Sequence, residues 1–474
     1  MSNVVASVFA FFAAQSGVPV EPVAEAAASA PALVEPVVPA VSTIEPTPVV
    51  PAASVPVAAP IVAPVVDPAA STPTPAPFSS IDSTWMNGQS KQNTFPLGSF
   101  NGVVTPSIYL DTNYAFSANH PRDNTLTGSA SIGRHNEFAI NLASVGLEWN
   151  VANVIGRLSL QFGSMLNVVQ DLDGTVLRGR NASTEALKHI REATAGYHFD
   201  ILHGINVEGG IFMSYVGLES YLLAENWTYN RSIVCDFTPF YFTGVRAQIF
   251  LSDTLKIEPW LMNGYQTYGK FNDAPAVGLA SRWNPSEALA FFANVYVGSD
   301  TRGDPERVRL HHDHSVLWRA YNDVDSLVFS KLAFSINNHI GFERGGTAGD
   351  FADNHFLGTA VSARAWTLQD HVALTGRFDY VQQPGGYSLQ FPPPGFVANN
   401  DFSIYGLTGS LELMPTDFFS IRPEVLYRHS SQAFFAGPGG TTSLDGFNDT
   451  VDSDFVADVV NDQLLFSVGA TFRL

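Results

Sequence analysis

The chain has 474 residues and a formal net charge of −20; only 14% of its residues are charged, whereas 12% are aromatic. The acidic balance argues against nucleic acid as a partner, because phosphate binding needs a basic surface. Soluble domains carry roughly 25% charged residues. A low charge content with many aromatic residues is instead typical of a membrane β-barrel, and the sequence has no run of the ~20 apolar residues that a spanning helix needs.

The first ninety-seven residues differ from the rest. The apolar stretch Val4–Ala14 predicts a signal peptide over residues 1–16, atypical because no Lys or Arg precedes Lys91. Residues 17–97 are rich in Pro, Ala and Val, and about half of the 30 prolines of the chain lie there. Proline prevents helix and sheet from propagating. We therefore expect a disordered periplasmic linker, either a passive tail or a tether that contacts the cell wall.

From residue 98 onward, strand-like stretches alternate with connections that are short at one end of each hairpin and long at the other. This sidedness is typical of an outer-membrane barrel, with short periplasmic turns and longer outer loops. We expect a transmembrane antiparallel up-and-down β-barrel over residues 98–474, with about 16 strands and a range of 14–18. The expected strands are 102–115, 137–149 with a bulge near Ser144, 155–165, 189–199, 205–215, 240–251, 255–265, 274–283, 288–298, 313–322, 327–342, 356–366, 371–382, 402–413, 418–429 and 463–474.

Within these strands one face is nearly free of charge, and Arg, Lys, Asp and Glu occupy the other. An Arg or Lys on the lipid face at mid-membrane costs ~2–4 kcal/mol, so the charged face must line the lumen. Rings of charged side chains set the ion preference of channels. The residues expected to line the lumen and set selectivity are Arg246, Lys256, Glu258, Arg364, Arg377, Asp379, Arg422, Glu424 and Arg428.

Several stretches resemble the "putative beta-barrel porin" family of the second type, outer-membrane proteins of Gram-negative bacteria. They are ENWTYNRS from Glu225, the following FTPFYFTGVRAQIFLSDTLKIEPWLMNGYQ, then FLGTAVSARAWTLQDHVALTGRFDYVQQPGG and SIRPEVLYRHSS. The resemblance covers about residues 100–474. It departs from the family in NGY, where NGW is expected, and in its last residue, Leu474 instead of Phe. It implies a porin for passive diffusion of small hydrophilic solutes, with no catalytic residues.

The long segment 216–239 is aromatic and rich in amides. It either folds into the lumen or forms an outer loop, and the sequence does not decide between them. If it folds inward, Glu225, Asn226, Trp227 and Arg231 are expected to line a constriction.

Metal sites and catalytic sites receive little support from the sequence. The cluster LHHDH from Leu310 and the acidic runs at Asp171 and Asp445 lack the spacing of a defined metal site, and the single cysteine, Cys235, cannot form an internal disulfide. Neither a catalytic triad nor a phosphate-binding loop stands out. We expect no metal, no cofactor and no enzymatic activity.

The leading hypothesis is an outer-membrane porin that passes small polar solutes or ions and is surrounded by outer-membrane lipid. One alternative is a structural barrel that tethers the outer membrane to the cell wall through its Pro-rich segment, and another is a soluble secreted all-β binding protein. The sequence leaves open whether the barrel forms homo-oligomers.

Overall fold

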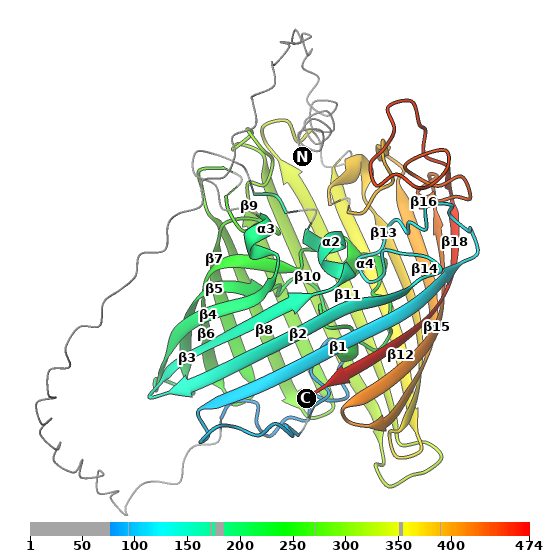
Figure 1. Cartoon of the computed structure of the whole chain (residues 1–474). Helices are drawn as coiled ribbons and strands as arrows, with labels where there is room; N and C mark the ends of the chain where they lie inside the picture. The colour runs from blue at the N-terminus through cyan, green and yellow to red at the C-terminus, as the bar shows by residue number, and fades with distance from the viewer. Residues whose placement is uncertain are drawn as a thin grey trace, which may run out of the picture. The chain divides into compact units, whose positions relative to one another are not determined.

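The alternating residues after residue 98 form antiparallel strands that close on themselves (Figure 1). The structure, a computed structural model, describes residues 76–92, 94–170, 173–175, 184–270, 272–349, 354–388 and 390–474. Sixteen of the strands within these ranges form one closed barrel. A closed sheet leaves no unpaired edge, and this is what allows strands to cross a membrane.

The barrel strands follow one another in chain order around the wall. They are β1 (Val104–Ser117), β2 (Phe138–Val151), β3 (Val154–Phe162), β4 (Ile190–Phe199), β5 (Ile205–Met213), β6 (Tyr241–Ser252), β7 (Leu255–Met262), β8 (Ala276–Ser286), β9 (Leu289–Gly298), β10 (Val308–Asn322), β11 (Lys331–Arg344), β12 (His355–Thr367), β13 (Val372–Gln382), β14 (Ser403–Thr416), β15 (Phe419–Ser430) and β18 (Asp462–Arg473).

The remaining elements are short and lie in the connections. They are the helices α2 (Ser164–Val169), α3 (Thr184–Leu187) and α4 (Ile233–Asp236), the 3₁₀ turns η2 (Leu223–Glu225) and η4 (Pro384–Gly386), and a separate two-stranded sheet of β16 (Phe435–Ala436) and β17 (Val459–Val460). Within the described part of the chain, no helix has the length and apolar character needed to span a membrane.

The last strand closes the barrel against the first, as the alternation at the end of the sequence predicts. In this antiparallel pair Tyr109 lies opposite Arg473 and Phe116 lies opposite Phe466. Phe466 and Val468 point outward and are each 45% exposed, whereas Leu465 and Ser467 are buried inside. The apolar face of the terminal strand therefore needs no protein cover, because it belongs to the outer wall.

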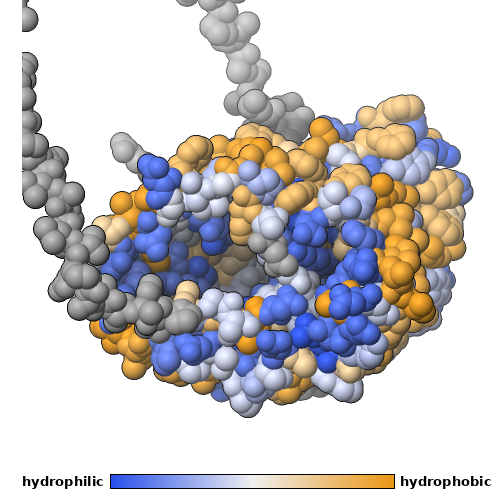
Figure 2. Space-filling view, turned by 90° about the horizontal axis from the view of Figure 1, so that it is seen from below, coloured by the Kyte–Doolittle hydropathy of each residue, from blue (hydrophilic) through white to orange (hydrophobic). Residues whose placement is uncertain are grey.

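The same division of faces runs around the whole barrel. Large apolar side chains lie exposed on the outer wall, among them Val145, Leu158, Val245, Leu279, Ile336, Val361, Leu374, Phe378, Leu407 and Val425. Away from the strand ends, the ionic residues of the strands face inward, among them Arg364, Arg377 and Glu424. Viewed from below, the hollowed end is rimmed by hydrophilic residues, and hydrophobic ones cover the outside (Figure 2). An apolar outer wall of this kind suits contact with hydrocarbon.

Placing one charge on this wall tests the assignment of the faces. We expect Leu407→Arg, in the middle of β14, to lower the free energy of unfolding in lipid vesicles by about 2–4 kcal/mol, the cost of a cation on the lipid face. Leu407→Phe keeps the face apolar and should cost much less. Equilibrium denaturant unfolding measures both values, and equal stability of the two variants would contradict a lipid-facing position.

Two local details differ from the sequence prediction. β10 begins at Val308, not at residue 313, because the polar residues at its start alternate faces and continue the strand. The bulge predicted near Ser144 is at Asn141, where the pairing of β1 with β2 shifts register. The extra residue brings Asn141 Nδ2 within 3.1 Å of Asp111 Oδ2 inside the barrel.

The prediction of a linker over residues 17–97 can be compared with the structure only in its last part. The signal peptide over 1–16 and linker residues 17–75 lie outside the described residues. The stretch from residue 76 to 92, however, packs within the barrel unit: Trp85 is 1% exposed and Met86 is fully buried. The prediction of a disordered linker is therefore wrong for this stretch, because its aromatic and polar side chains find partners in the lumen.

Candidate functional site: the lumen and its inserted segment

The connection between β5 and β6, residues 214–240, turns into the barrel and is called the inserted segment here. It carries η2 and α4, and Trp227, Tyr229 and Arg231 are at most 1% exposed. Of the two alternatives that the sequence left open for 216–239, the structure shows the inward fold.

Local hydrogen bonds give the inserted segment its own shape. The Asn226 side chain closes a turn: its Oδ1 accepts from Ser220 N at 2.7 Å and its Nδ2 donates to Ser220 O at 2.9 Å. Arg231 donates to Tyr221 O at 2.6 Å. Ser232 caps α4 by accepting from Cys235 N at 3.2 Å. Amide and hydroxyl side chains commonly stabilise turns and helix starts in this way.

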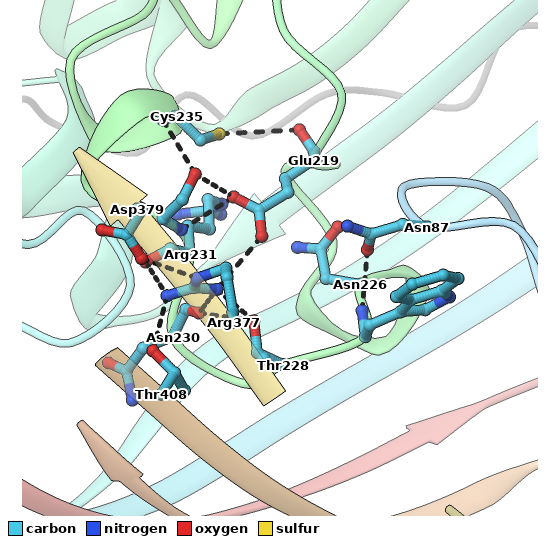
Figure 3. Close-up of polar contacts among 12 residues, drawn as sticks. Asn87, Glu219, Asn226, Thr228, Asn230, Arg231, Cys235, Arg377, Asp379 and Thr408 are labelled. Carbon is cyan, nitrogen blue, oxygen red and sulfur yellow. Dashed lines mark hydrogen bonds and ion pairs between the residues drawn. The ribbon is translucent and has the colours of Figure 1, made fainter. Parts of the chain in front are cut away.

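Arg377, on β13, joins this segment to the barrel wall (Figure 3). Its guanidinium donates to Asn230 O at 2.8 Å and to Arg231 O at 3.0 Å. It also pairs with Asp379 at 2.8 Å and with Glu219 at 3.2 Å. Because both carboxylates are buried beside the guanidinium, they compensate its charge.

Arg422, on β15, holds an earlier part of the segment. It donates to three carbonyl oxygens, those of Leu223 at 2.8 Å, Asn226 at 3.1 Å and Thr228 at 3.2 Å. Arg364, on β12, donates to Trp227 O at 3.0 Å. Hydrogen bonds from an ionised donor are roughly twice as strong as neutral ones, so these two arginines act as anchors for the inserted backbone.

Glu424 and Arg428, both on β15, complete the anchors. Glu424 accepts from the backbone N–H groups of Tyr229, at 2.7 Å, and Asn230, at 2.9 Å. Arg428 donates to Arg231 O and pairs with Asp236, each at 2.9 Å. The β12–β15 side of the lumen is thus occupied by the inserted segment.

The nine predicted lumen residues therefore fall into two groups. All nine lie on the inner face, but Arg364, Arg377, Asp379, Arg422, Glu424 and Arg428 are at most 4% exposed and are covered by the inserted segment. Arg246 and Lys256 keep 16% and 22% of their side chains accessible, and Glu258 lies between them. The first group anchors the segment, and the second borders two cavities.

The four residues expected to line a constriction do not line an opening. Asn226, Trp227 and Arg231 are packed between the segment and the wall, at most 1% exposed. Glu225 is partly exposed; burial raises the pKa of its carboxyl group, although Ser220 donates to it at 2.5 Å. The segment faces cavities instead through Tyr215, Glu219 and other residues near its start.

Opposite the anchors, a ladder of charges runs along the inner face from β2 to β7. The charge ladder consists of Glu148, Arg157, Arg191, Glu192, Glu208, Arg246, Lys256 and Glu258, joined by ion pairs such as Arg157–Glu148 and Arg246–Glu208, both 2.8 Å. It holds four carboxylates and four cations. Sequence reasoning selected only its last three members, although Arg157 and Glu208 follow the same alternation and could have been found.

Two cavities border this ladder. One of about 210 Å³ lies between the inserted segment and the wall and is lined by Tyr215, Lys256, Glu258 and Arg282, among others. The other, of about 280 Å³, is lined by residues that include Glu148, Arg157, Glu208 and Arg246. These two cavities therefore lie along β2–β9 and carry both signs of charge; a further cavity of about 260 Å³, lined by Lys91, Glu412 and Arg473 among others, borders β14 and β18.

Of the weak metal motifs, LHHDH and the run at Asp445 form no shared ligand site among the described residues. LHHDH lies inside β10, where His311 and Asp313 point inward and are buried, whereas His312 and His314 point to the opposite face and are half-buried. No group of three or more potential ligands is found among the described residues. Asp171 lies outside those residues, and Asp445 accepts hydrogen bonds from Ser443 and Phe447 in an outer loop.

Cys235 is buried in α4. Burial raises the pKa of its thiol. The thiolate form, which reacts with thiol reagents, is therefore scarce.

A family model described as "Putative beta-barrel porin-2, OmpL-like" matches residues 104–474. No curated protein matches the sequence.

Solved structures with a similar barrel have low sequence identity. OmpT of Vibrio cholerae is 12% identical, with 80% of this chain and 99% of that chain covered and a TM-score of 0.46. The outer membrane channel DcaP of Acinetobacter baumannii is 12% identical, with 79% and 99% covered and a TM-score of 0.47. OprB of Pseudomonas putida is 10% identical, with 79% and 95% covered and a TM-score of 0.49. At this level the likeness says nothing about solutes.

Proposed function

Because the chain belongs to the second beta-barrel porin family over residues 104–474, we propose that it passes small hydrophilic solutes or ions through the outer membrane. The observation that supports this most is the charge ladder beside accessible cavities, inside a barrel whose outer wall is apolar. In this proposal the short-turn end faces the periplasm and the long loops face outward.

The path runs along β2–β9, between the charge ladder and the inserted segment. On the β12–β15 side the inserted segment covers Arg364, Arg377, Arg422 and Arg428, so these arginines do not contribute to selectivity. Arg246, Lys256 and Glu258 keep the role that sequence analysis expects for them. Homo-oligomer formation and cell-wall contact stay predictions. The closed barrel and the membership of a porin family argue against a soluble secreted binding protein.

Neutralising one ladder residue at a time tests this path. Glu258→Gln leaves the ladder with one excess positive charge, so we expect the reversal potential in a KCl gradient to shift toward anion preference. Lys256→Gln should shift it toward cations. Each shift should be small, because one charge of the eight in the ladder changes.

The reversal potential is measured in planar bilayers that contain the refolded protein. Arg307→Gln, just before β10 and outside the ladder, serves as a control. Shifts of the same sign for the two ladder variants would contradict the proposed path, and so would the absence of conductance steps from the parent and all variants.

A further inference from the structure

Residues 76–92, ahead of β1, lie at the short-turn end of the barrel (Figure 1), and Trp85 and Met86 among them are buried in its interior. Near the start of this stretch, Phe78 N donates to Asp253 O in the turn between β6 and β7 at 2.8 Å. Further along the chain, Phe100 pairs with Val104 at the start of β1. Between these points lies a stretch that is called the plug here, residues 78–92.

The innermost part of the plug contacts the inserted segment directly. Trp227 Nε1 donates to Trp85 O at 3.0 Å, and Trp227 N donates to Asn87 Oδ1 at 2.8 Å. Gly88 N donates to Glu225 O at 3.1 Å. Trp85 and Met86 also belong to a buried apolar cluster with Leu218, Trp227, Leu317 and Trp366. The plug and the inserted segment therefore form one packed mass in the lumen.

Charged residues of the wall hold the two ends of the plug. Asp82 pairs with Arg319 at 3.1 Å, and Lys91 pairs with Glu412 at 3.1 Å. Burial alone would raise the pKa of Asp82, but hydrogen bonds from Thr84 and the charges of Lys331 and Arg319 outweigh it and hold the pKa below its usual value.

Arg282, on β8, also depends on the plug. It donates to Ser83 Oγ at 2.8 Å, and its guanidinium lies 4.7 Å from the centre of the Phe78 ring. Its other strong hydrogen bond goes to the Asn284 side chain. Among the described residues, Arg282 forms no ion pair with a carboxylate, so removing the plug would leave its charge facing the lumen.

The plug contributes no strand to the barrel, whose strand pairing runs from β1 to β18 without it. It can therefore leave without breaking a backbone hydrogen bond between strands of the wall. We propose that residues 78–92 are a built-in plug that narrows the short-turn end of the lumen, and that its release opens a wider path in which Arg282 and Arg319 favour anions. This rests on the proposed porin function.

A glycine pair in the N-terminal stretch tests the plug with little change in chemistry. Gly88 has φ +73°, and a Cβ there would lie 1.8 Å from Leu218 O, which is backbone. Gly98 has φ +68°, and a Cβ there would meet nothing within 4 Å. The two substitutions to Ala carry the same backbone strain, and only Gly88→Ala creates a clash in the docked plug.

We expect Gly88→Ala to raise the ratio of open to plugged channels at least about tenfold, since a clash of this size exceeds the 1.4 kcal/mol that corresponds to that factor. Gly98→Ala should conduct like the parent. Deleting residues 78–92 from the full chain should give the largest conductance steps and a reversal potential shifted toward anions. Heat modifiability in detergent gels checks that each barrel is folded.

Three outcomes are distinguishable. If the parent conducts and neither Gly88→Ala nor the deletion increases its conductance, the plug is overturned and the proposed function stands. Larger steps without an anion shift would overturn the role of Arg282 and Arg319. If the parent, Gly88→Ala and the deletion variant all fold but none of them conducts, the porin function and the plug are both overturned.

Discussion

Glu412→Gln should lower the free energy of unfolding by about 3–5 kcal/mol, the usual cost of removing one partner of a buried ion pair. Glu412 lies on β14, is 2% exposed and forms ion pairs with three cations: Lys91 at 3.1 Å, Arg422 at 3.2 Å and Arg364. Without its carboxylate, all three lose their shared counter-charge. Because Lys91 belongs to the plug and both arginines anchor the inserted segment, we also expect larger conductance steps.

Glu343→Gln is the matched control. Glu343 is also 2% exposed and pairs with Arg307 at 2.5 Å and Arg309 at 2.9 Å, but it lies at the long-loop end of β11. The side chains of these arginines are 23% and 13% exposed, so water can partly replace the lost partner. Denaturant unfolding in vesicles should show a smaller loss for this variant. A loss as large as that of Glu412→Gln would show that burial of the cations does not set the cost.

Trp227→Ala should be comparably destabilising, by about 3–5 kcal/mol, the range for removing a buried aromatic side chain. Trp227 is 1% exposed, lies edge to face with Trp366 at 5.9 Å and donates its ring N–H to Trp85 O. Truncation therefore opens a cavity at the point where the plug meets the inserted segment. We expect loss of stability together with increased conductance.

Trp318→Ala provides the comparison, because Trp318 is 52% exposed on the outer wall, where lipid can fill the space that the ring leaves. Its stability loss should be clearly smaller, and its conductance should equal that of the parent. Unfolding in vesicles and single-channel recording measure the two effects. If both tryptophan variants lose the same stability and neither changes conductance, Trp227 does not hold the lumen contents in place.

The anchors and the charge ladder divide the lumen into two sides with different tasks. On β12–β15, arginines and carboxylates are buried and bind backbone groups of the inserted segment. On β2–β7, ion pairs remain partly accessible and border cavities. A charge that bonds buried carbonyl groups stabilises structure, whereas an accessible charge acts on passing solutes. This difference cannot be read from the alternation, which is the same on both sides.

The strands themselves were predictable because their signal is local. Successive side chains of a strand point to opposite faces, so the lipid-facing residues of β14, such as Tyr405, Leu407 and Gly409, can be recognised from neighbouring residues alone. The same rule places Arg377 and Glu424 inside. Each of the sixteen expected strands corresponds to a strand of the barrel, with differences mainly at the ends.

The contents of the lumen were not predictable in this way. The composition of the first ninety-seven residues indicated a linker, yet Trp85 is held by Trp227, 142 positions away. The direction of the inserted segment depends on Glu424, 194 positions from Asn230. Contacts over such separations leave no periodic trace in the chain. Alternation therefore specifies a barrel with an apolar outside and a charged inside, and only tertiary packing decides which inner charges anchor a segment and which remain beside the open path.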